Sequence, residues 1–279
     1  MECSILILTK NEEKDLPGCI ETLKWSDDII LYDSFSNDKT LEIAKKNGLR
    51  IVQRSFDNWS SHQNWGLRNI DFKYKWVLYI DADERLTDPL IEEIKNIKDP
   101  SGNAFKIRRR DYLEGKHLKY VQSSQWYIRL FKPEAISYTR LVNPITHVKG
   151  HSKKLKGYIN HYPFSKGIEH WIKKHNSYST FEAEEILKNK NKKINLNISS
   201  LIFEKDILKK RSQQKIFFYK LPFRPFIKFI LIYFLKLGFL DGKEGFKYSI
   251  LQSIYEYFIV LKTHEKSQND KYNIRKKIN

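Results

Sequence analysis

The sequence predicts an α/β fold whose core is a mostly parallel β-sheet. Three short apolar runs, at residues 4–8, 28–33 and 76–80, are rich in Ile, Leu, Val and Tyr, which is typical of buried strands. Segments with helical spacing separate these runs, and strands alternating with helices form parallel β-α-β units. We therefore expect a mixed, mostly parallel sheet with helices on both faces, followed by a helical extension.

The elements between these strands follow from local patterns. A first helix is predicted over residues 11–24, because its apolar side chains recur at helical spacing. A second helix ends at Asn47 and Gly48, which are typical helix-stopping residues. A third strand is predicted at 50–53 and a further helix over 61–69. Residues 104–108 form another strand-like run.

Several functions are disfavoured by what the sequence lacks. No glycine-rich dinucleotide or P-loop motif follows the first strand. The two cysteines, Cys3 and Cys19, form no Cys-x-x-Cys pair and no Cys/His cluster, so neither a disulfide framework nor a zinc site is indicated. The apolar run near the N-terminus is too short for a signal peptide. We expect a protein of the reducing cytosol.

Charge is distributed unevenly along the chain. The net charge is +18, of which residues 1–140 contribute +1 and residues 141–279 contribute +17. A strongly basic half indicates an acidic partner, either an anionic membrane surface or nucleic acid. The basic half contains no helix-turn-helix, RNA-recognition or zinc signature, so nucleic acid is not the expected partner.

The second half contains helical patterns of two kinds. The pattern of residues 177–188 predicts a helix, and a basic run at 188–193 predicts a loop. Residues 226–240 are apolar and aromatic but include Lys228 and Lys236, and this run is shorter than the ~20 residues that a membrane span needs. The run therefore predicts a helix at the membrane interface, with a buried helix as the alternative. An apolar stripe continues in the helix that follows.

Two carboxylates follow the strand at 76–80. Asp81 and Asp83 stand where an α/β sheet binds ligands, at the carboxyl end of a strand. A pair of nearby carboxylates suits Mg²⁺ or Mn²⁺, which completes its shell with substrate phosphates. The pattern predicts a metal-bridged diphosphate; the alternative is a polar, solvated turn.

Polar residues also follow the other two strands. Thr9, Asn11 and Glu12 come after the first strand, and Asp33 ends the second. In a parallel sheet these ends share one edge with Asp81, so a base and ribose could lie beside a metal-bound diphosphate. Thr9 and Asn11 could instead cap the first helix.

Taken together, these segments resemble the family 2 glycosyltransferases, which have the GT-A fold. The matching segments are residues 7–13 (opening Thr-Lys-Asn-Glu-Glu), 33–40, 81–85 (Asp-Ala-Asp-Glu-Arg), 108–110, 129–131, 161–162 and 238–242. The most similar group is the bacterial enzymes that build lipopolysaccharide core, O-antigen, capsule and other exopolysaccharides.

The resemblance implies roles for individual residues. Thr9 and Glu12 match positions near the base and ribose, and Asp33 matches the acid that hydrogen-bonds the base. Asp81 matches an acid near the ribose and diphosphate, and Asp83 matches the metal ligand. Asn64 matches an asparagine on the helix that flanks the nucleotide, and Asn11 is also assigned to the nucleotide-sugar site. The alternative for Asn64 and its neighbour His62 is a helix surface or cap.

The implied chemistry is an inverting transfer. A sugar moves from a nucleotide-diphosphate sugar, with a UDP-sugar as the expected donor, to a lipid-linked glycan. A divalent cation, Mg²⁺ or Mn²⁺, would neutralise charge on the leaving diphosphate. A carboxylate would remove the proton of the acceptor hydroxyl.

The base does not match the family pattern. Relatives place a Glu shortly after the Arg-Leu-Phe segment, where this chain has Pro144. Asp111 is our candidate base because it follows the strand-like run at 104–108; its alternative role is an ion pair with the arginines at 108–110. Glu114, Glu134 and His147 are further candidates. If none serves, the chain would be an altered or inactive transferase that acts as a binding or scaffold subunit.

We therefore divide the chain into two parts. Residues 1–165 form the nucleotide-sugar-binding and catalytic domain, and residues 166–279 form a basic, mainly helical region on the membrane or acceptor side. Bacterial glycans of this kind are assembled on lipid carriers at the cytoplasmic leaflet. We expect a cytoplasmic protein that associates peripherally with the inner face of the membrane, with anionic lipid contributing through the basic residues.

Overall fold

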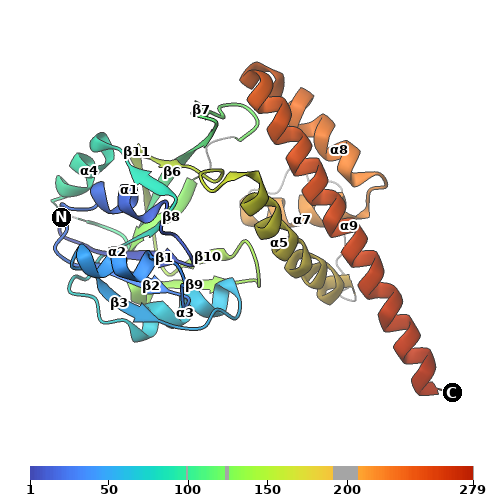
Figure 1. Ribbon diagram of the computed structural model, residues 1–279, viewed down its shortest axis with the longest axis horizontal. Coiled ribbons are helices and arrows are strands. Elements are labelled where there is room, and N and C mark those ends of the chain that lie inside the picture. Colours follow the sequence, from blue (N-terminus) through green and yellow to red (C-terminus); the bar gives the residue numbers. More distant parts are fainter. Residues whose placement is uncertain (99, 123–125, 191–206, 279) are drawn as a thin grey trace. The chain divides into compact units, whose positions relative to one another are not determined.

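The chain folds into two compact units. The computed structural model describes residues 1–98, 100–122, 126–190 and 207–278. The first unit is Met1–Trp171 and the second is Ile172–Asn279, so the division falls within one helix, α5 (Gly167–Lys190) (Figure 1).

The first unit is built on a nine-stranded mixed sheet. The strand order is β3-β2-β1-β4-β8-β6-β11-β5, with β7 paired to β6. The strands are β1 (Ser4–Thr9), β2 (Ile29–Asp33), β3 (Arg50–Gln53), β4 (Val77–Asp81), β5 (Glu84–Leu86), β6 (Ala104–Leu113), β7 (Lys116–His117), β8 (Trp126–Phe131) and β11 (Ser152–His161). The first four strands are parallel, and β8 runs against both β4 and β6. The α/β class and the mostly parallel sheet are confirmed.

Helices cover both faces of this sheet, as the sequence predicts. The helices of the first unit are α1 (Leu16–Glu21), α2 (Thr40–Lys46), α3 (Trp59–Asn69), α4 (Asp88–Lys95) and the short 3-10 helix η1 (Pro133–Ala135). Because both faces are covered, β1, β2 and β4 are continuous apolar runs rather than alternating ones.

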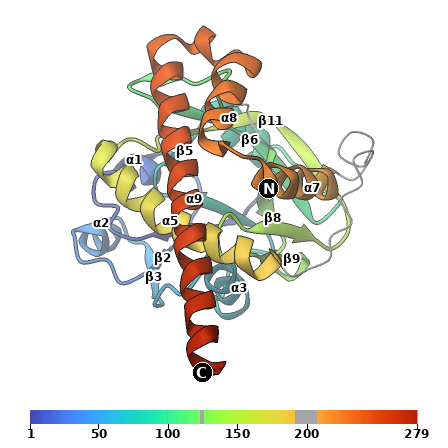
Figure 2. The same ribbon diagram turned by 90° about the vertical axis from the view of Figure 1, so that its right-hand side faces the viewer.

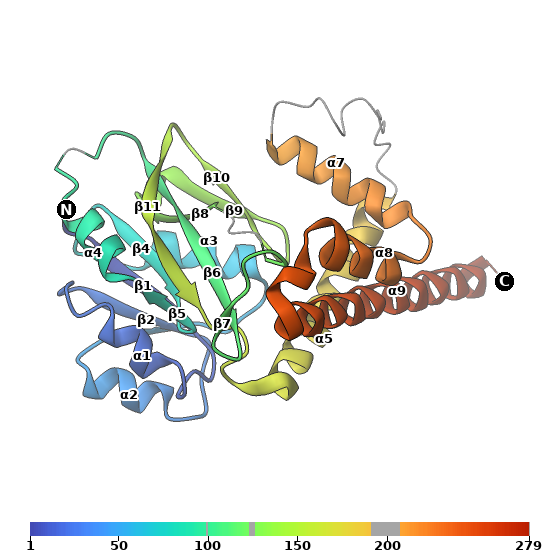
Figure 3. The same ribbon diagram turned by 90° about the horizontal axis from the view of Figure 1, so that it is seen from above.

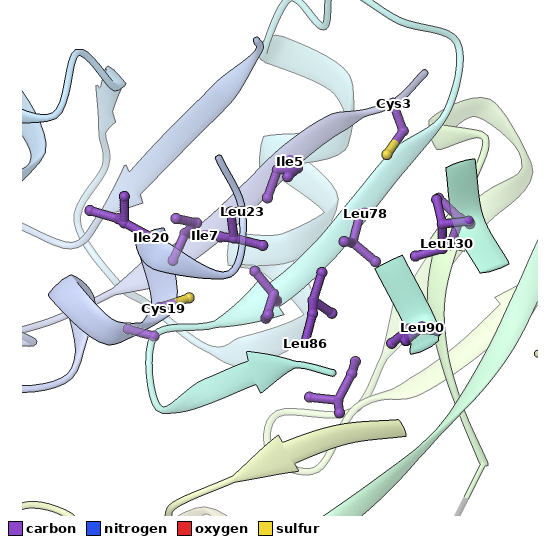
Figure 4. Packing of buried hydrophobic residues seen from close by; sticks show 14 of the residues in the cluster. Cys3, Ile5, Ile7, Cys19, Ile20, Leu23, Leu78, Leu86, Leu90 and Leu130 are labelled. Carbon is purple, nitrogen blue, oxygen red and sulfur yellow. The ribbon is translucent and has the colours of Figure 1, made fainter. Parts of the chain in front are cut away.

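One face forms the larger hydrophobic core. Ile20 of α1 and Leu23, just after it, lie beside Ile5 and Ile7 of β1 (Figure 4), and Leu16 of α1 belongs to the same cluster. Helices α2 and α4 contribute to the same core, and Figure 3 shows α1 and α2 together on one side of β1 and β2. The two cysteines are buried free thiols, Cys3 and Cys19.

The opposite face packs against α3. Tyr32, Val77 and Tyr79 lie on this side together with Trp65 and Leu67 of α3. A two-stranded hairpin, β9 (Ile136–Thr139) and β10 (Ile145–Val148), adds further apolar side chains to this second core.

Two elements differ in length from the sequence prediction. Helix α1 begins at Leu16 rather than at residue 11, because Asn11 has a left-handed backbone (φ 56°) that no α-helix accepts. Strand β6 continues past residue 108 to Leu113, because it pairs in parallel with β11 as far as Asp111 opposite His161. Asp111 therefore lies within a strand rather than after one.

The second unit is helical. It contains most of α5, then α7 (Ile207–Lys220), α8 (Arg224–Ile230), the π-helical turn η2 (Leu231–Leu235), the 3-10 helix η3 (Gly238–Asp241) and α9 (Gly242–Ile278). Figure 2 shows α8 beside the first turns of α9. The helix predicted at 177–188 lies within α5, and residues 191–193 of the predicted basic loop lie outside the described residues.

The apolar run at 226–240 is not one helix. It contains most of α8, the turn η2 and most of η3, because Leu237 has a left-handed backbone (φ 58°) that ends the helical path. Along the described parts of the chain, each helix is too short or too polar to cross a membrane.

Candidate active site

The carboxyl ends of three parallel strands bring the predicted site residues together. Thr9 of β1 lies in register with Asp33 of β2, and its neighbour Leu8 lies in register with Asp81 of β4. These residues come from segments up to 72 positions apart in sequence, and they meet because parallel strands end at the same edge of a sheet.

Asp33 is a fully buried acceptor at this edge. Its Oδ1 accepts hydrogen bonds from Thr9 Oγ1 (3.0 Å) and Ser36 Oγ (2.5 Å). Its Oδ2 accepts from the Ser36 backbone N–H (2.8 Å) and from Gln53 Nε2 (3.1 Å). A carboxylate offers about four lone-pair positions, so all of them are used within the protein. A direct hydrogen bond between Asp33 and a nucleotide base would have to replace one of these four hydrogen bonds.

The loop after β1 is held to the loop after β2. The side chain Oδ1 of Asn11 accepts a hydrogen bond from the Asn37 backbone N–H (2.9 Å), and the Asn11 N–H donates to Ser36 Oγ (2.8 Å). Glu12 accepts a hydrogen bond from Lys166 Nζ (2.6 Å). Asn11 and Glu12 therefore shape the rim beside Asp33.

A buried cluster of charges surrounds the end of β4. Arg129 Nη2 donates to Asp81 Oδ2 (2.9 Å) and to Glu84 Oε1 (2.6 Å). Tyr79 Oη donates to the other oxygen of Asp81 (2.9 Å), and Glu84 Oε2 accepts from the Asp81 backbone N–H (3.1 Å). Both carboxylates are thus fixed by partners before any ligand binds.

The pKa values of Asp81 and Glu84 are shifted in opposite directions in this cluster. Burial opposes ionisation of Asp81, but the Arg129 charge outweighs it and lowers the pKa of Asp81. Burial raises the pKa of Glu84, which lies deeper and is fully covered. Asp81 therefore stays ionised at neutral pH, with its charge matched by Arg129.

Asp83 is paired with a histidine from the far end of the sheet. His161 Nε2 lies 3.3 Å from Asp83 Oδ2, and His161 Nδ1 contacts Asp111 Oδ1. Asp111 also forms an ion pair with Arg109, with 3.0 Å between Arg109 Nε and Asp111 Oδ1. Asp83, His161, Asp111 and Arg109 form one continuous chain of charged contacts.

Burial and charge act in opposite directions in this chain. Burial disfavours the Asp111 carboxylate, but the Arg109 guanidinium holds the pKa of Asp111 well below its usual range. Burial and Arg109 oppose protonation of His161, yet Asp83 and Asp111 raise the pKa of His161 to about 9. Asp111 is thus an ionised carboxylate with little solvent contact and two cationic partners.

The carboxylates Asp81 and Asp83 suit a divalent cation whose other ligands come from a substrate. Among the described residues no group of three or more His, Cys, Asp and Glu side chains forms a complete metal site. Mg²⁺ and Mn²⁺ need only one or two protein carboxylates when phosphates supply other ligands. Asp83 suits this role better than Asp81, whose oxygens are taken by Tyr79 and Arg129.

The predicted residue Asn64 has a structural position. Its Nδ2 donates to the carbonyl of Tyr138 (2.9 Å) and its Oδ1 accepts from the Tyr138 N–H (2.8 Å), so it joins α3 to β9. Its neighbour His62 is buried and stacks on Tyr32 at 4.2 Å rather than lying on the helix surface.

The candidate bases occupy different places. Because β8 runs against β4, Glu134 lies at the opposite edge of the sheet, beside Ile70 and Lys75. We call the edge of the sheet that carries Asp33, Asp81 and Asp83 the acidic edge. The Leu141 carbonyl accepts a hydrogen bond from the backbone N–H of Trp59 at the start of α3, so the turn that contains Pro144 lies on the side of this edge. His147 is exposed on β10, and Glu114 is exposed in the turn between β6 and β7.

Arg129, Glu84 and His161 are site residues that lie in the matching segments 129–131, 81–85 and 161–162, but none of them is assigned a role in the sequence analysis. Arg129 interrupts an apolar run, residues 126–131, and a buried arginine in such a run needs an acidic partner. That pattern could have indicated its pairing with the acids after β4. His161 carries no comparable local signal, because its partners lie 50 and 78 residues away.

Comparison with known proteins identifies the class. Residues 4–155, more than half of the chain, match the family model described as Glycosyl transferase family 2. The acidic edge of a mostly parallel sheet and this match define a glycosyltransferase of the GT-A fold. The chain belongs to glycosyl transferase family 2.

Individual relatives cover most of the chain. An uncharacterized glycosyltransferase of Rickettsia typhi is 27% identical over 71% of this chain and 72% of its own length. The lipopolysaccharide core biosynthesis glycosyltransferase LpsC of Rhizobium meliloti is 23% identical over 94% and 92%. Among solved structures, residues 1–349 of TarS from S. aureus align at TM-score 0.44 and 13% identity, over 92% of this chain and 91% of that chain.

Proposed function

We propose that the protein moves a sugar from a nucleotide-diphosphate sugar to a lipid-linked glycan, in the synthesis of lipopolysaccharide, O-antigen, capsule or exopolysaccharide. The observation that carries the proposal is the meeting of Asp33, Asp81 and Asp83 at one edge of the sheet in a family 2 chain. The similarity to LpsC along nearly the whole chain supports the lipopolysaccharide setting. A UDP-sugar is the proposed donor.

The donor would lie along the acidic edge. Its nucleoside would occupy the rim formed by Thr9, Asn11 and Glu12, with Asp33 beneath it holding the strand ends in place. Its diphosphate would lie beside Asp83. A Mg²⁺ or Mn²⁺ ion held there by Asp83 would supply neutralisation of the charge on the leaving diphosphate.

His161 is the second group that could hold the cation. Its Nε2 is directed at Asp83, and Asp111 fixes the ring through Nδ1. A carboxylate on the second ring nitrogen is the usual partner of a metal-binding histidine. When no cation is bound, protonated His161 balances the charge of Asp83.

These contacts support a positioning role for Asp111 in place of the catalytic base. A base must accept a proton from the acceptor hydroxyl within hydrogen-bond reach. Asp111 is buried, is paired with Arg109 and His161, and has a pKa far below neutrality, so it has little tendency to take a proton. For an inverting transfer we propose that the base comes from the exposed groups on the side of the acidic edge, of which Glu114 is the carboxylate nearest in sequence to Asp111.

The proposal is tested with purified protein and a panel of UDP-, GDP-, dTDP- and CMP-sugars. We expect one donor class to bind in a manner that depends on Mn²⁺ or Mg²⁺, and Asp83→Ala to abolish both the metal dependence and transfer. Asp27→Ala is the matched control, because Asp27 is an exposed acid at the opposite edge of the sheet. Normal turnover of the Asp83→Ala protein in EDTA would contradict the metal role.

The presence of Pro144 supports one alternative. A proline cannot abstract a proton, so the chain could bind a donor without transferring it. Measuring donor hydrolysis and acceptor-dependent transfer in parallel distinguishes the two functions. Metal-dependent binding with neither reaction, across lipid-linked acceptors, would favour a binding or scaffold subunit.

A further inference from the structure

The C-terminal unit exposes large apolar side chains around α8, η2 and η3. Phe223 is 82% exposed, Leu235 71% and Phe226 64%. We call the following six residues the apolar end: Phe223, Phe226, Phe234, Leu235, Leu237 and Phe239. Single exposed apolar residues are ordinary, but so many within one short segment of a folded protein indicate an interaction surface.

The apolar end is held together by a half-buried aromatic cluster. Tyr233 contacts the rings of Phe234 (5.1 Å between centroids) and Phe239 (6.3 Å), and Phe229 stacks on Tyr233 (5.3 Å). Phe226 lies two helical turns before Phe234, on the same stripe of the helical path. Tyr233 therefore joins two of the exposed aromatic side chains, Phe234 and Phe239, and Phe226 lies on the same side of the helical path as Phe234.

Two of these residues occupy strained backbone. Phe223 (φ 49°) and Leu237 (φ 58°) are both left-handed, a conformation that favours Gly or Asn over bulky side chains. Phe223 is 82% exposed and Leu237 45%, so neither side chain is buried in the folded protein. A strained backbone conformation that is not accompanied by burial of the side chain indicates a functional constraint on that side chain.

The charge around this surface has one sign. Residues 220–247 contain five lysines besides the buried Arg224, among them exposed Lys220, Lys236 and Lys243. The two acids of the segment, Asp241 and Glu244, are buried at 2% and 6% exposure. The exposed charge of the segment is therefore entirely positive.

We propose that the apolar end docks on an anionic lipid bilayer, with its aromatic and leucine side chains in the interfacial region and the lysines at the headgroups. Apolar groups rimmed by lysines match the interfacial mode of membrane binding. A second copy of the chain fits less well, because it would bring the lysines of both copies together. The proposal goes beyond sugar transfer and does not rest on it.

The test uses substitutions that suit the backbone. Phe223→Asn with Leu237→Asn removes two exposed apolar side chains and places at both positions a residue that tolerates positive φ. We expect the melting temperature to be unchanged or raised. We expect binding to vesicles of phosphatidylcholine and phosphatidylglycerol to fall by about tenfold or more, in proportion to the apolar surface lost.

The chain offers a matched control in the first unit. Phe35 also has positive φ (58°) and is 52% exposed, so Phe35→Asn makes the same chemical change outside the C-terminal unit. We expect this variant to bind the mixed vesicles as the wild type does. Lys236→Gln with Lys243→Gln is expected to remove part of the salt-sensitive binding and to leave the apolar part.

The outcomes distinguish binding to a lipid bilayer from binding to a second copy of the chain. Wild-type protein that floats with mixed vesicles at low salt, binds pure phosphatidylcholine weakly and loses binding in the asparagine pair supports the proposal. Absence of binding to the mixed vesicles at low salt would overturn it. So would an asparagine pair that binds vesicles fully while losing self-association in analytical ultracentrifugation, because the surface would then belong to a second copy.

Discussion

At the scale of single residues, the carboxylates of the acidic edge differ in the groups that contact them. Asp33 is enclosed by four donors, Asp81 is matched by Arg129, and Asp83 faces His161. A buried carboxylate without partners would be very costly, so each acid brings its own stabilising groups. The surroundings of each side chain, rather than its type, separate a structural acid from one that can meet a ligand.

Replacing Asp33 by Asn tests its enclosed position. The amide has one oxygen and a donating nitrogen, so it cannot accept both from the two hydroxyls at Oδ1 and from Ser36 N–H and Gln53 at Oδ2, as the carboxylate does. We expect Asp33→Asn to lower the free energy of unfolding by about 1–3 kcal/mol and to weaken nucleotide binding as a consequence. Urea denaturation and calorimetric titration with UDP measure the two effects. Weaker nucleotide binding at unchanged stability would instead assign Asp33 a direct contact with the base.

Asp111→Asn distinguishes a positioning residue from a base. As a partner of His161 Nδ1, Asp111 should affect cation affinity, and the loss of such a partner typically weakens metal binding by about 10- to 100-fold. We expect this weakening in Mn²⁺ titrations, with transfer recovering at high Mn²⁺. Glu114→Gln, in the same segment, should leave Mn²⁺ affinity unchanged. If Asp111→Asn loses turnover that no Mn²⁺ concentration restores, with cation affinity intact, the base assignment is correct.

At the scale of elements, two contacts hold helices against their neighbours. Asn64 uses its amide to complete the hydrogen bonding of the β9 backbone, as another strand would. In the C-terminal unit the turn η3 packs directly on the first turn of α9. Both contacts depend on residue identity, since one needs an amide and the other needs a glycine.

Asn64→Ala should behave as a structural substitution. It leaves the Tyr138 N–H and carbonyl without their partners, and we expect a loss of about 1–3 kcal/mol in the free energy of unfolding. Nucleotide affinity should be unchanged within about twofold below the unfolding transition. Asn69→Ala, a change at an exposed amide at the end of the same helix, is the control. A large loss of UDP affinity in Asn64→Ala at intact stability would support the nucleotide role.

Gly245 is where α9 approaches η3 most closely. A Cβ added at this position would lie 2.1 Å from the carbonyl oxygen of Gly238, which is backbone and cannot move aside cheaply. We expect Gly245→Ala to destabilise the C-terminal unit by about 1–3 kcal/mol or more. Lys247→Ala, on an exposed position of the same helix, should have little effect. Thermal melts that show equal stability for both variants would contradict this packing.

At the scale of the whole molecule, the two units differ in composition and in surface. The first unit has a net charge of +5 and forms the sheet with its acidic edge. The second unit has a net charge of +13 and forms helices with exposed apolar and basic residues. Under the two proposals above, the first unit would carry the sugar transfer and the second would contact the membrane.

The stability of the protein should depend on pH through His62. Burial, assisted by the Arg54 charge, lowers the pKa of His62 to about 4 in the folded protein, against an ordinary 6.5. Below pH 6.5 the unfolded chain binds a proton that the folded chain does not, so stability is complete above this pH and falls until about pH 4. The loss is at most about 3 kcal/mol.

Urea denaturation from pH 7.5 to pH 4 measures this effect. His62→Gln should make the free energy of unfolding fall less steeply over the window from pH 6.5 to pH 4, although it costs stability at pH 7 through lost stacking on Tyr32. His264→Gln, on an exposed part of α9, should leave the slope unchanged. Parallel slopes for His62→Gln and wild type would exclude His62 as the source.

The sequence by itself determined the α/β class, the positions of the first four strands along the chain and the family. These properties rest on local signals, since buried parallel strands are continuous apolar runs and each is followed by its own polar residues. The acids Asp33, Asp81 and Asp83 could be found for the same reason, because the end of a strand in a parallel sheet implies a place at one edge.

Only the tertiary structure decided which groups meet these acids. Arg129 and His161 reach Asp81 and Asp83 across 48 and 78 residues, through an antiparallel strand and a distant parallel one. It also placed Asp111 in a charged chain and Asn64 in a contact with β9, and it divided the apolar run at 226–240 into three pieces. The physical reason is that hydrogen bonds and burial depend on neighbours in space, and local patterns do not specify pairing between remote strands or the turn at which a helix breaks.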